Sequence, residues 1–326
     1  MIIDGHCDTL TVALDQNKLI NDKELNFNLE SAKNLKDSVI QMMAIYISPD
    51  KYITRKINKS WLRTNSVIKN FNRQKEILKN EIIHITNVED IKKVKQENKI
   101  GILLTIENGS AICGNLYRIK QLYDYGIRVM SITWNKDNEL GCGAHTVNDK
   151  GLTNLGIKYV QQLNKNNIII DVSHTSKKTF EDVIKYSNKP IIATHSCAYS
   201  ICQHPRNLSD LQIKQIAQSG GIIGVCYYSD FLNNNGIANS DDIVKHIVYI
   251  VNLVGIDYVG LGSDFDGMDK NKLPTDIKNI EDIKLIKQKL IKRRFNSVQI
   301  NKILGENWER FLLNNLWYLM SKGDSF

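Results

Sequence analysis

The chain has 326 residues, of which 42% are hydrophobic and 24% are charged, and these are the proportions of a globular protein with a sizeable core. Its net charge of +8 comes from lysines spread along the chain, without a nucleic-acid motif and without the apolar run of about 18 residues that a membrane span needs. The sequence also lacks a secretory leader and a Cys-x-x-Cys pair, so we expect six reduced cysteines, a cytoplasmic protein, and neither a nucleic-acid nor a membrane partner.

Short apolar runs alternate with longer stretches of helical period along the chain. The strand-like runs are residues 1–8, 38–47, 100–109, 128–135, 167–174, 189–196, 220–228 and 257–267. The helix-like stretches between them are residues 55–79, 87–98, 115–125, 152–166, 176–187, 208–219 and 240–254. Thr175 and Ser176 suit the N-cap of the fifth of these helices, and Ser240 suits the N-cap of the last.

This alternation predicts the fold class. Buried apolar strands separated by helices are typical of a parallel α/β sheet covered on both faces, and eight strands close into a (β/α)8 TIM barrel. An open doubly wound sheet is the alternative, but it usually carries a Gly-rich phosphate loop after its first strand, and "GHCDTL" has none. We expect one barrel domain over residues 1–326, with helices at about 279–320 packed on its outside or bottom.

Metal-competent side chains stand at the C-terminal ends of the predicted strands. They are His6 and Asp8 on the first strand, Glu107 on the third, His174 on the fifth, His195 on the sixth, and Asp264 and Asp266 on the eighth. Each alone has an ordinary explanation, as a hydrogen-bonded histidine or as a turn or capping aspartate. Because barrel enzymes carry their chemistry at this end of the strands, five of eight strands ending in this way favour a common site.

The spacing of His6 and Asp8 indicates a metal site. Residues two apart on a strand face the same side, so one imidazole and one carboxylate can reach the same ion, while Cys7 points to the other face and packs. This ligand chemistry suits zinc first, with manganese, cobalt or iron as substitutes.

The number of ligands exceeds what one catalytic zinc requires, since that ion keeps an open position. A bridging carboxylate allows two ions that share one hydroxide. Glu107 is the natural bridge, so we expect His6, Asp8 and Glu107 to hold one ion and Glu107, His174 and His195 to hold the other.

Several stretches together resemble a known family. They are "DGHCDTL", "TIENG", "DVSHTS", "ATHSCAYS", "HPRNLSD" and "GLGSDFDG", in that order over residues 2–267, followed by "ILGENWERF" at 303–311. Together they resemble the membrane (renal) dipeptidase family. The resemblance implies a barrel of the metal-dependent amidohydrolase type with two zinc ions, and hydrolysis of dipeptides, including those with a C-terminal D-residue, by a metal-bridging hydroxide. It also admits a homodimer.

The resemblance further implies roles for residues outside the ligand set. Asp264 matches the catalytic acid/base, and Arg206 matches the arginine that binds the substrate carboxylate, with Asn207 beside it as a further substrate-binding residue. Trp134 stands where animal members have a histidine that contacts substrate, so we expect it at the substrate. His145 follows in the next loop and could take that histidine's place, although an ordinary loop histidine is the favoured interpretation.

Asn108 follows Glu107 where the family usually has glycine, which is tolerable if only Glu107 binds metal. Asp15 is a candidate for the substrate's free amine.

Other activities stay open at this level, because one barrel and one metal pair can serve a lactonase, a deacetylase or a phosphoester hydrolase. Arg206 favours a substrate with a free carboxylate. A non-catalytic binding protein is disfavoured, since every expected ligand position and Asp264 hold competent residues.

Overall fold

The computed structural model describes residues 1–48 and 58–316. Its strands are β1 (Ile2–Cys7), β2 (Val39–Tyr46), β3 (Ile82–His84), β4 (Ile100–Glu107), β5 (Ile127–Ser131), β6 (Ile169–Asp171), β7 (Ile191–Ile192), β8 (Ile223–Val225) and β9 (Val259–Leu261). Its α-helices are α1 (Thr9–Asp15), α2 (Leu29–Asn34), α4 (Lys59–Ile77), α5 (Val88–Glu97), α6 (Tyr117–Asp124), α7 (Asn154–Lys165), α8 (Lys177–Tyr186), α9 (Asp210–Gln218), α10 (Ser229–Leu232), α11 (Ser240–Val254), α12 (Ile283–Lys292), α13 (Ser297–Asn301) and α14 (Asn307–Asn315). Short 3-10 turns occur at Gly109–Ile112, Ile256–Tyr258, Lys270–Lys272 and Ile280–Asp282, and a π-helical turn, Lys302–Glu306, joins α13 to α14.

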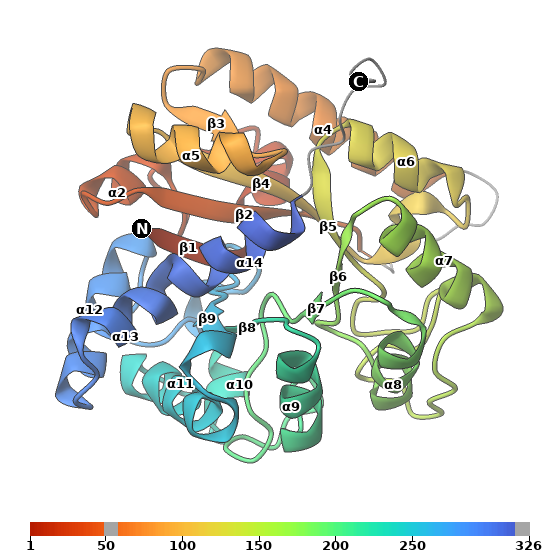
Figure 1. Cartoon of the computed structure of the whole chain (residues 1–326). Helices are drawn as coiled ribbons and strands as arrows, with labels where there is room; N and C mark the ends of the chain where they lie inside the picture. The colour runs from red at the N-terminus through yellow and green to blue at the C-terminus, as the bar shows by residue number, and fades with distance from the viewer. Residues whose placement is uncertain (49–57, 317–326) are drawn as a thin grey trace, which may run out of the picture.

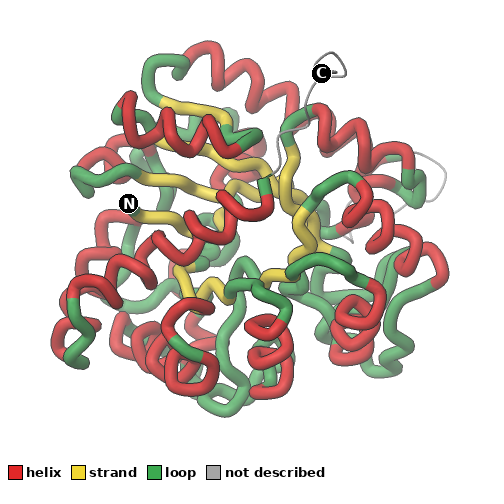
Figure 2. The backbone as a smooth tube through the Cα atoms, in the orientation of Figure 1, coloured by secondary structure: helices red, strands yellow, loops and turns green. Residues whose placement is uncertain are grey.

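The strands form a barrel with helices around it (Figures 1 and 2). Eight parallel strands follow one another in the order β7-β6-β5-β4-β2-β1-β9-β8. A parallel bridge between Ala193 and Ile223 joins the two ends of this series, beside β7 and β8. The predicted (β/α)8 barrel is therefore confirmed. β3 lies off the ring, where it pairs with the first residues of β4.

Each predicted strand overlaps an observed strand, but the last four observed strands are much shorter than the apolar runs that predicted them. β6 ends at Asp171 and β7 at Ile192, so His174 and His195 each lie three residues beyond the sheet. β3, α1, α2 and α10 were not predicted. Residues 55–57 and 317–320, which the predicted helices included, lie outside the described residues.

The two N-cap predictions have different outcomes. Ser176 caps α8, with its hydroxyl accepting a hydrogen bond from the Thr179 amide. The prediction for Ser240 is wrong, because Asn239 is the N-cap of α11 and accepts from the Asp241 amide. Asn239 has the extended backbone that an N-cap requires, whereas Ser240 is already helical.

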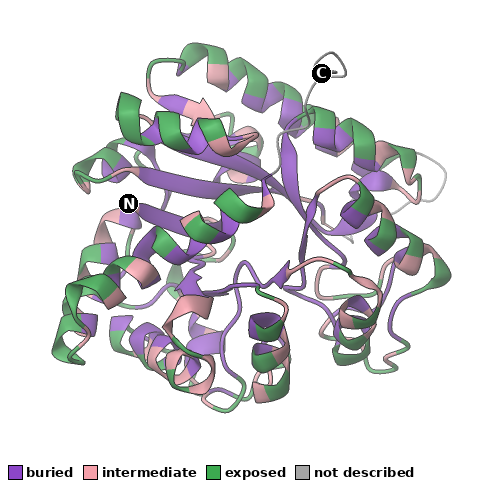
Figure 3. Cartoon of the chain, in the orientation of Figure 1, coloured by how far each residue is buried: buried purple, intermediate pink, exposed green. Residues whose placement is uncertain are grey.

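The barrel interior is apolar and is closed at one end by α14. Strand residues such as Ile3, Met42 and Leu103 form one buried cluster with Trp308. The Trp308 indole donates to the Leu261 carbonyl, and its ring lies against Gly5 and Gly260, where any side chain would collide with it. Figure 3 shows the buried strands inside a shell of helices whose outer faces are exposed. Chemistry is therefore confined to the opposite end, where the strands finish.

Within residues 1–48 and 58–316, no helix combines the length and the hydrophobicity needed to cross a bilayer. All six cysteines are unpaired, and Cys7 is fully buried in the apolar layer, as predicted.

Candidate active site

The five predicted ligands meet at the end of the barrel where the strands finish. The Nε2 atom of His6 lies 3.4 Å from Asp8 Oδ2, 3.7 Å from Glu107 Oε2 and 3.8 Å from Asp264 Oδ1. The other oxygen of Glu107, Oε1, lies 2.7 Å from His174 Nε2 and 3.8 Å from His195 Nε2. The two oxygens of Glu107 thus face two different groups of side chains, which is the geometry of a bridging carboxylate.

The expectation that Asp8 lies on the first strand, on the same face as His6, was wrong. Asp8 is not a strand residue that shares a face with His6, because β1 ends at Cys7 and Asp8 is the N-cap of α1. The Asp8 amide donates to the Phe265 carbonyl, which anchors the turn beside β9. The turn, rather than strand alternation, brings the carboxylate to His6.

The tautomers of the two facing histidines follow from their neighbours. His174 Nδ1 bonds to the Asn135 side-chain oxygen at 2.8 Å, so Nδ1 carries the proton. His195 Nδ1 bonds to the Thr194 hydroxyl at 2.8 Å, and that hydroxyl gives its own proton to Asp171. His195 Nδ1 therefore also carries the proton, and neither Nε2 has one.

These two unprotonated Nε2 atoms lie only 2.7 Å apart. Burial lowers the pKa of both His174 and His195 well below the ordinary value, so neither ring is an imidazolium. Glu107 Oε1 lies beside them, 2.7 Å from His174 Nε2, so three atoms with lone pairs meet at one point. A cation at this point would remove the repulsion, and its ligands would be those that zinc prefers.

His6 gives a second sign of a cation. Neither of its ring nitrogens has a hydrogen-bond partner, and Asp8 Oδ1 has none either, although both residues are buried. Burial alone would lower the pKa of His6, but the nearby carboxylate of Asp8 and the charges of Glu107 and Asp264 raise it to about 10. The concentration of negative charge that favours a proton on His6 favours a metal ion equally. The residues present therefore fit divalent metal binding.

Strained backbone surrounds the centre. His174 and Asp264 both have positive φ, 70° and 63°, which is uncommon outside glycine and typical of functional sites. Asn108 has φ 80°, where asparagine is better tolerated than most residues, and its side chain donates to the Ile47 carbonyl. Asn108 therefore replaces a glycine without turning toward the metal ligands.

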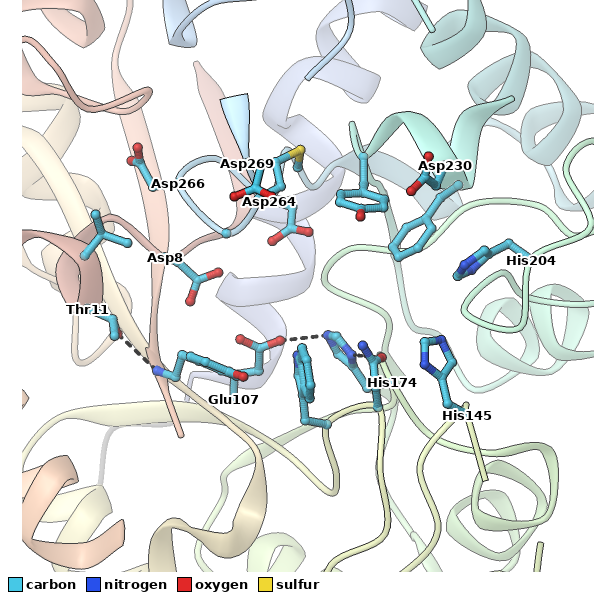
Figure 4. Close-up of a pocket in the computed structure, with 18 of the residues that line it drawn as sticks. Asp8, Thr11, Glu107, His145, His174, His204, Asp230, Asp264, Asp266 and Asp269 are labelled. Atoms are coloured by element: carbon cyan, nitrogen blue, oxygen red, sulfur yellow. Dashed lines mark hydrogen bonds and ion pairs between the residues drawn. The ribbon is translucent and has the colours of Figure 1, made fainter. Parts of the chain in front are cut away.

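The centre opens into a cavity of about 600 Å³. Figure 4 shows Asp8, Asp264, Asp266 and Asp269 on one side of it and His145 and His204 on the other, with Glu107 and His174 between. The other lining residues are Thr11, Val12, Asp15, Tyr46, Trp134, Asn135, Tyr228, Asp230, Phe231, Gly267 and Met268. The cavity walls are thus acidic at one end, whereas the other end carries aromatic rings together with Asp230, which is paired with Lys272.

The predicted substrate residues divide between the cavity wall and the layer behind it. Trp134 lines the cavity, with its ring stacked 5.9 Å from that of His174. His145 also lines it, which the sequence did not favour. Arg206 and Asn207 are not among the described lining residues: Arg206 is buried behind the Phe231 ring, 5.3 Å from its centroid.

Asn207 and the residues around it build this wall. The Asn207 amide donates to the carbonyls of Cys202 and Phe231 and so joins its own loop to α10. Phe231, Tyr228 and His204 were not predicted as site residues. Their only sequence signal was the position of His204 within "HPRN", since α10, which carries Phe231, is too short to show a period.

A parallel barrel with histidines and carboxylates gathered where its strands end is the architecture of a metal-dependent hydrolase. Comparison with known proteins shows to which family of hydrolases the chain belongs. Over residues 1–314 the sequence matches the family described as "Membrane dipeptidase (Peptidase family M19)". An uncharacterised protein in the pqqA 5′ region of Klebsiella pneumoniae is 33% identical over 238 residues, which is 70% of this chain and 86% of that protein.

Solved structures share the fold. An amidohydrolase from Pseudomonas aeruginosa is 25% identical, with a TM-score of 0.82 over 97% of this chain and 96% of its own. A metallo peptidase from Rhodobacter sphaeroides, liganded with a phosphinate mimic of the dipeptide L-Ala-D-Ala, is 22% identical, with a TM-score of 0.87 over 97% and 99% of the two chains. The chain belongs to the membrane dipeptidase family and is a metal-dependent dipeptidase, as its motifs predicted.

Proposed function

We propose that the chain cleaves dipeptides with two divalent ions, zinc in the first place, bridged by Glu107. His6 and Asp8 would complete the ligands of one ion, and His174 and His195 those of the other. The observation that carries this proposal is the approach of two unprotonated histidine nitrogens, 2.7 Å apart, to one oxygen of Glu107, while its other oxygen faces His6.

Divalent ions bound here would supply Lewis-acid activation of water and of the scissile carbonyl. The protein's own part is proton transfer by Asp264. Burial raises the pKa of Asp264 to about 7, and its Oδ1 faces His6 at the centre. A carboxylate with that pKa can take a proton from the attacking water and return it to the leaving amine near neutral pH.

The charges around the cavity favour one orientation of the dipeptide. Asp269 lies at the acidic end, which suits the free amine of the substrate, and Asp15 also lines the cavity, where it forms an ion pair with Arg63. Arg206 lies behind the aromatic end and would attract the free carboxylate. Trp134, stacked on His174, and His145, against His204, line the cavity wall and would contact the substrate there. The dipeptide mimic bound by the Rhodobacter relative supports L-Ala-D-Ala as a first substrate to try.

The experiment combines metal analysis with a substrate panel. We expect about two zinc, manganese or cobalt ions per chain, and hydrolysis of L-Ala-D-Ala in preference to an acyl-lactone, an N-acetylated amino acid or nitrophenyl phosphate. Asp264→Asn should keep the metal and lower kcat by about 10² or more, because removing a general acid/base typically costs that much. Near-normal turnover by Asp264→Asn would reject its role, and absence of metal from the purified protein would reject the centre.

The homodimer and the cytoplasmic location stay predictions of the sequence. Both can be checked on the purified and the native protein, by light scattering and by cell fractionation.

A further inference from the structure

Asp264 has two carboxylate oxygens in different surroundings. Oδ1 faces the metal centre, 3.8 Å from His6 Nε2. Oδ2 points the other way and accepts a hydrogen bond from the thiol of Cys226, with sulfur and oxygen 3.7 Å apart. Cys226 directly follows β8. This strand pairs with β9, the strand that leads to Asp264.

The main chain of Asp264 is fixed without help from its side chain. Its amide donates to the His6 carbonyl at 3.1 Å, and its carbonyl accepts from the Gly267 amide at the same distance. With φ held at 63°, the carboxylate can still rotate about its side-chain bonds. Which oxygen faces the metal centre therefore depends on what holds the side chain.

The Cys226 thiol is arranged to act as a donor. Its sulfur accepts the Tyr228 amide proton at 3.5 Å, so its single hydrogen is free to point at Asp264. Burial, and then the charge of Asp264, raises the pKa of Cys226 well above its ordinary value, so the sulfur keeps its proton. Cys226 is fully buried.

We propose that Cys226 is a positioning residue, which holds the Asp264 carboxylate with Oδ2 tied back and Oδ1 turned toward the reacting atoms. This rests on the proposed role of Asp264 as the acid/base. Cys226 itself touches neither substrate nor metal. Its loss should slow the chemical step, because an Asp264 free to rotate is in the productive orientation for only part of the time.

The test compares Cys226→Ala and Cys226→Val, which lack a donor, with Cys226→Ser, which keeps one. With L-Ala-D-Ala as substrate and metal-loaded enzyme, we expect Ala and Val to lower kcat about 5- to 10-fold, with KM within about 2-fold and metal content unchanged. Cys226→Ser should return kcat to within about 2-fold of the wild type. If the Ala variant fails to fold, the comparison of Val with Ser decides.

Cys197→Ala is the matched control. Cys197 is also buried in this layer, but its thiol donates to the Cys226 carbonyl, 3.3 Å away, and not to a carboxylate. Its kcat should match that of the wild type. Unchanged kcat in both Cys226→Ala and Cys226→Val, or a serine variant no better than valine, would overturn the proposal while leaving the dipeptidase activity intact. A wild-type enzyme without dipeptidase activity would instead contradict the proposed function.

Discussion

The Nε2 atoms of His174 and His195 face each other at 2.7 Å, and the hydrogen bonds of both rings leave neither atom with a proton. Two lone pairs at this separation repel, and Glu107 Oε1 lies beside them, 2.7 Å from His174 Nε2. Folding has to bring these groups together against their repulsion unless a cation binds with them. Metal binding and stability are therefore coupled at this site.

Removing the metal should destabilise the protein. At a free metal concentration of 100 times Kd, binding stabilises the folded state by about 2.7 kcal/mol, and a chelator should remove that contribution. We expect a fall in Tm of several degrees on chelation, restored by zinc, in a thermal melt. His195→Ala should lose most of this response, whereas His145→Ala, outside the ligand set, should keep it. A wild-type Tm that does not respond to chelation would contradict metal binding.

Arg206 should make the enzyme prefer a dipeptide with a free C-terminal carboxylate over the corresponding C-terminal amide. We expect Arg206→Ala to lower kcat/KM for L-Ala-D-Ala about 100-fold, mostly through KM, because a charge-assisted contact is lost. The C-terminal amide of the same dipeptide should be a poor substrate for the wild type and should lose little more in the variant.

The control for this experiment is Arg118→Ala, an arginine that stacks on Trp61 away from the cavity. It should affect neither substrate. Equal losses for the acid and the amide in Arg206→Ala would mean that Arg206 supports the wall rather than the carboxylate.

The sequence predicted the barrel and the ligand set for one physical reason: parallel strands finish at one edge, so polar residues after each apolar run must converge. These side chains converge even where strands were short, since His174 and His195 lie beyond β6 and β7 but still reach Glu107, and their role as metal ligands stays a prediction. β3 was missed because three residues cannot show a period.

What the sequence could not give is packing between loops. Phe231 covers Arg206, and Cys226 reaches Asp264, through contacts between segments more than 20 residues apart. Neither contact leaves a local pattern, because each depends on how two loops are oriented by the strands beneath them. The burial of Arg206 and the partner of Asp264 were therefore visible only in the structure.

Gly267 should be needed for catalysis more than for folding. A methyl group at this position would collide with Asp264 Oδ1 and Asp8 Oδ2, both of which face the metal centre. Since these are the ends of side chains, they can move aside at little cost in stability. We expect Gly267→Ala to lower kcat at least 10-fold with a Tm change of only about 2 °C, measured by steady-state kinetics and thermal melts. The same substitution at Gly114, near only Leu155 but with φ 71°, should lower Tm through backbone strain and leave kcat unchanged. A normal kcat in Gly267→Ala would show that the carboxylates do not need this space.

His84 should make stability depend on pH away from the active site. Burial, and then the charges of Lys75 and Arg128, lowers the pKa of His84 to about 4, whereas an unfolded histidine titrates near 6.5. Between these values the unfolded chain binds a proton that the folded chain does not, so stability is full above about pH 6.5 and falls as the pH drops toward 4. The loss from this residue is at most about 3 kcal/mol. Its Nε2 has no hydrogen-bond partner.

The measurement is urea unfolding of the wild type and of His84→Leu at several pH values between 4.5 and 8. The difference between the two proteins cancels the contribution of the histidines at the metal centre, which both proteins share. We expect the free energy of unfolding to fall less steeply with decreasing pH in the variant, so that the variant gains relative to the wild type on acidification. Parallel pH profiles would show that His84 keeps its ordinary pKa in the folded protein, and that its burial between Phe71 and Gly126 does not exclude the imidazolium.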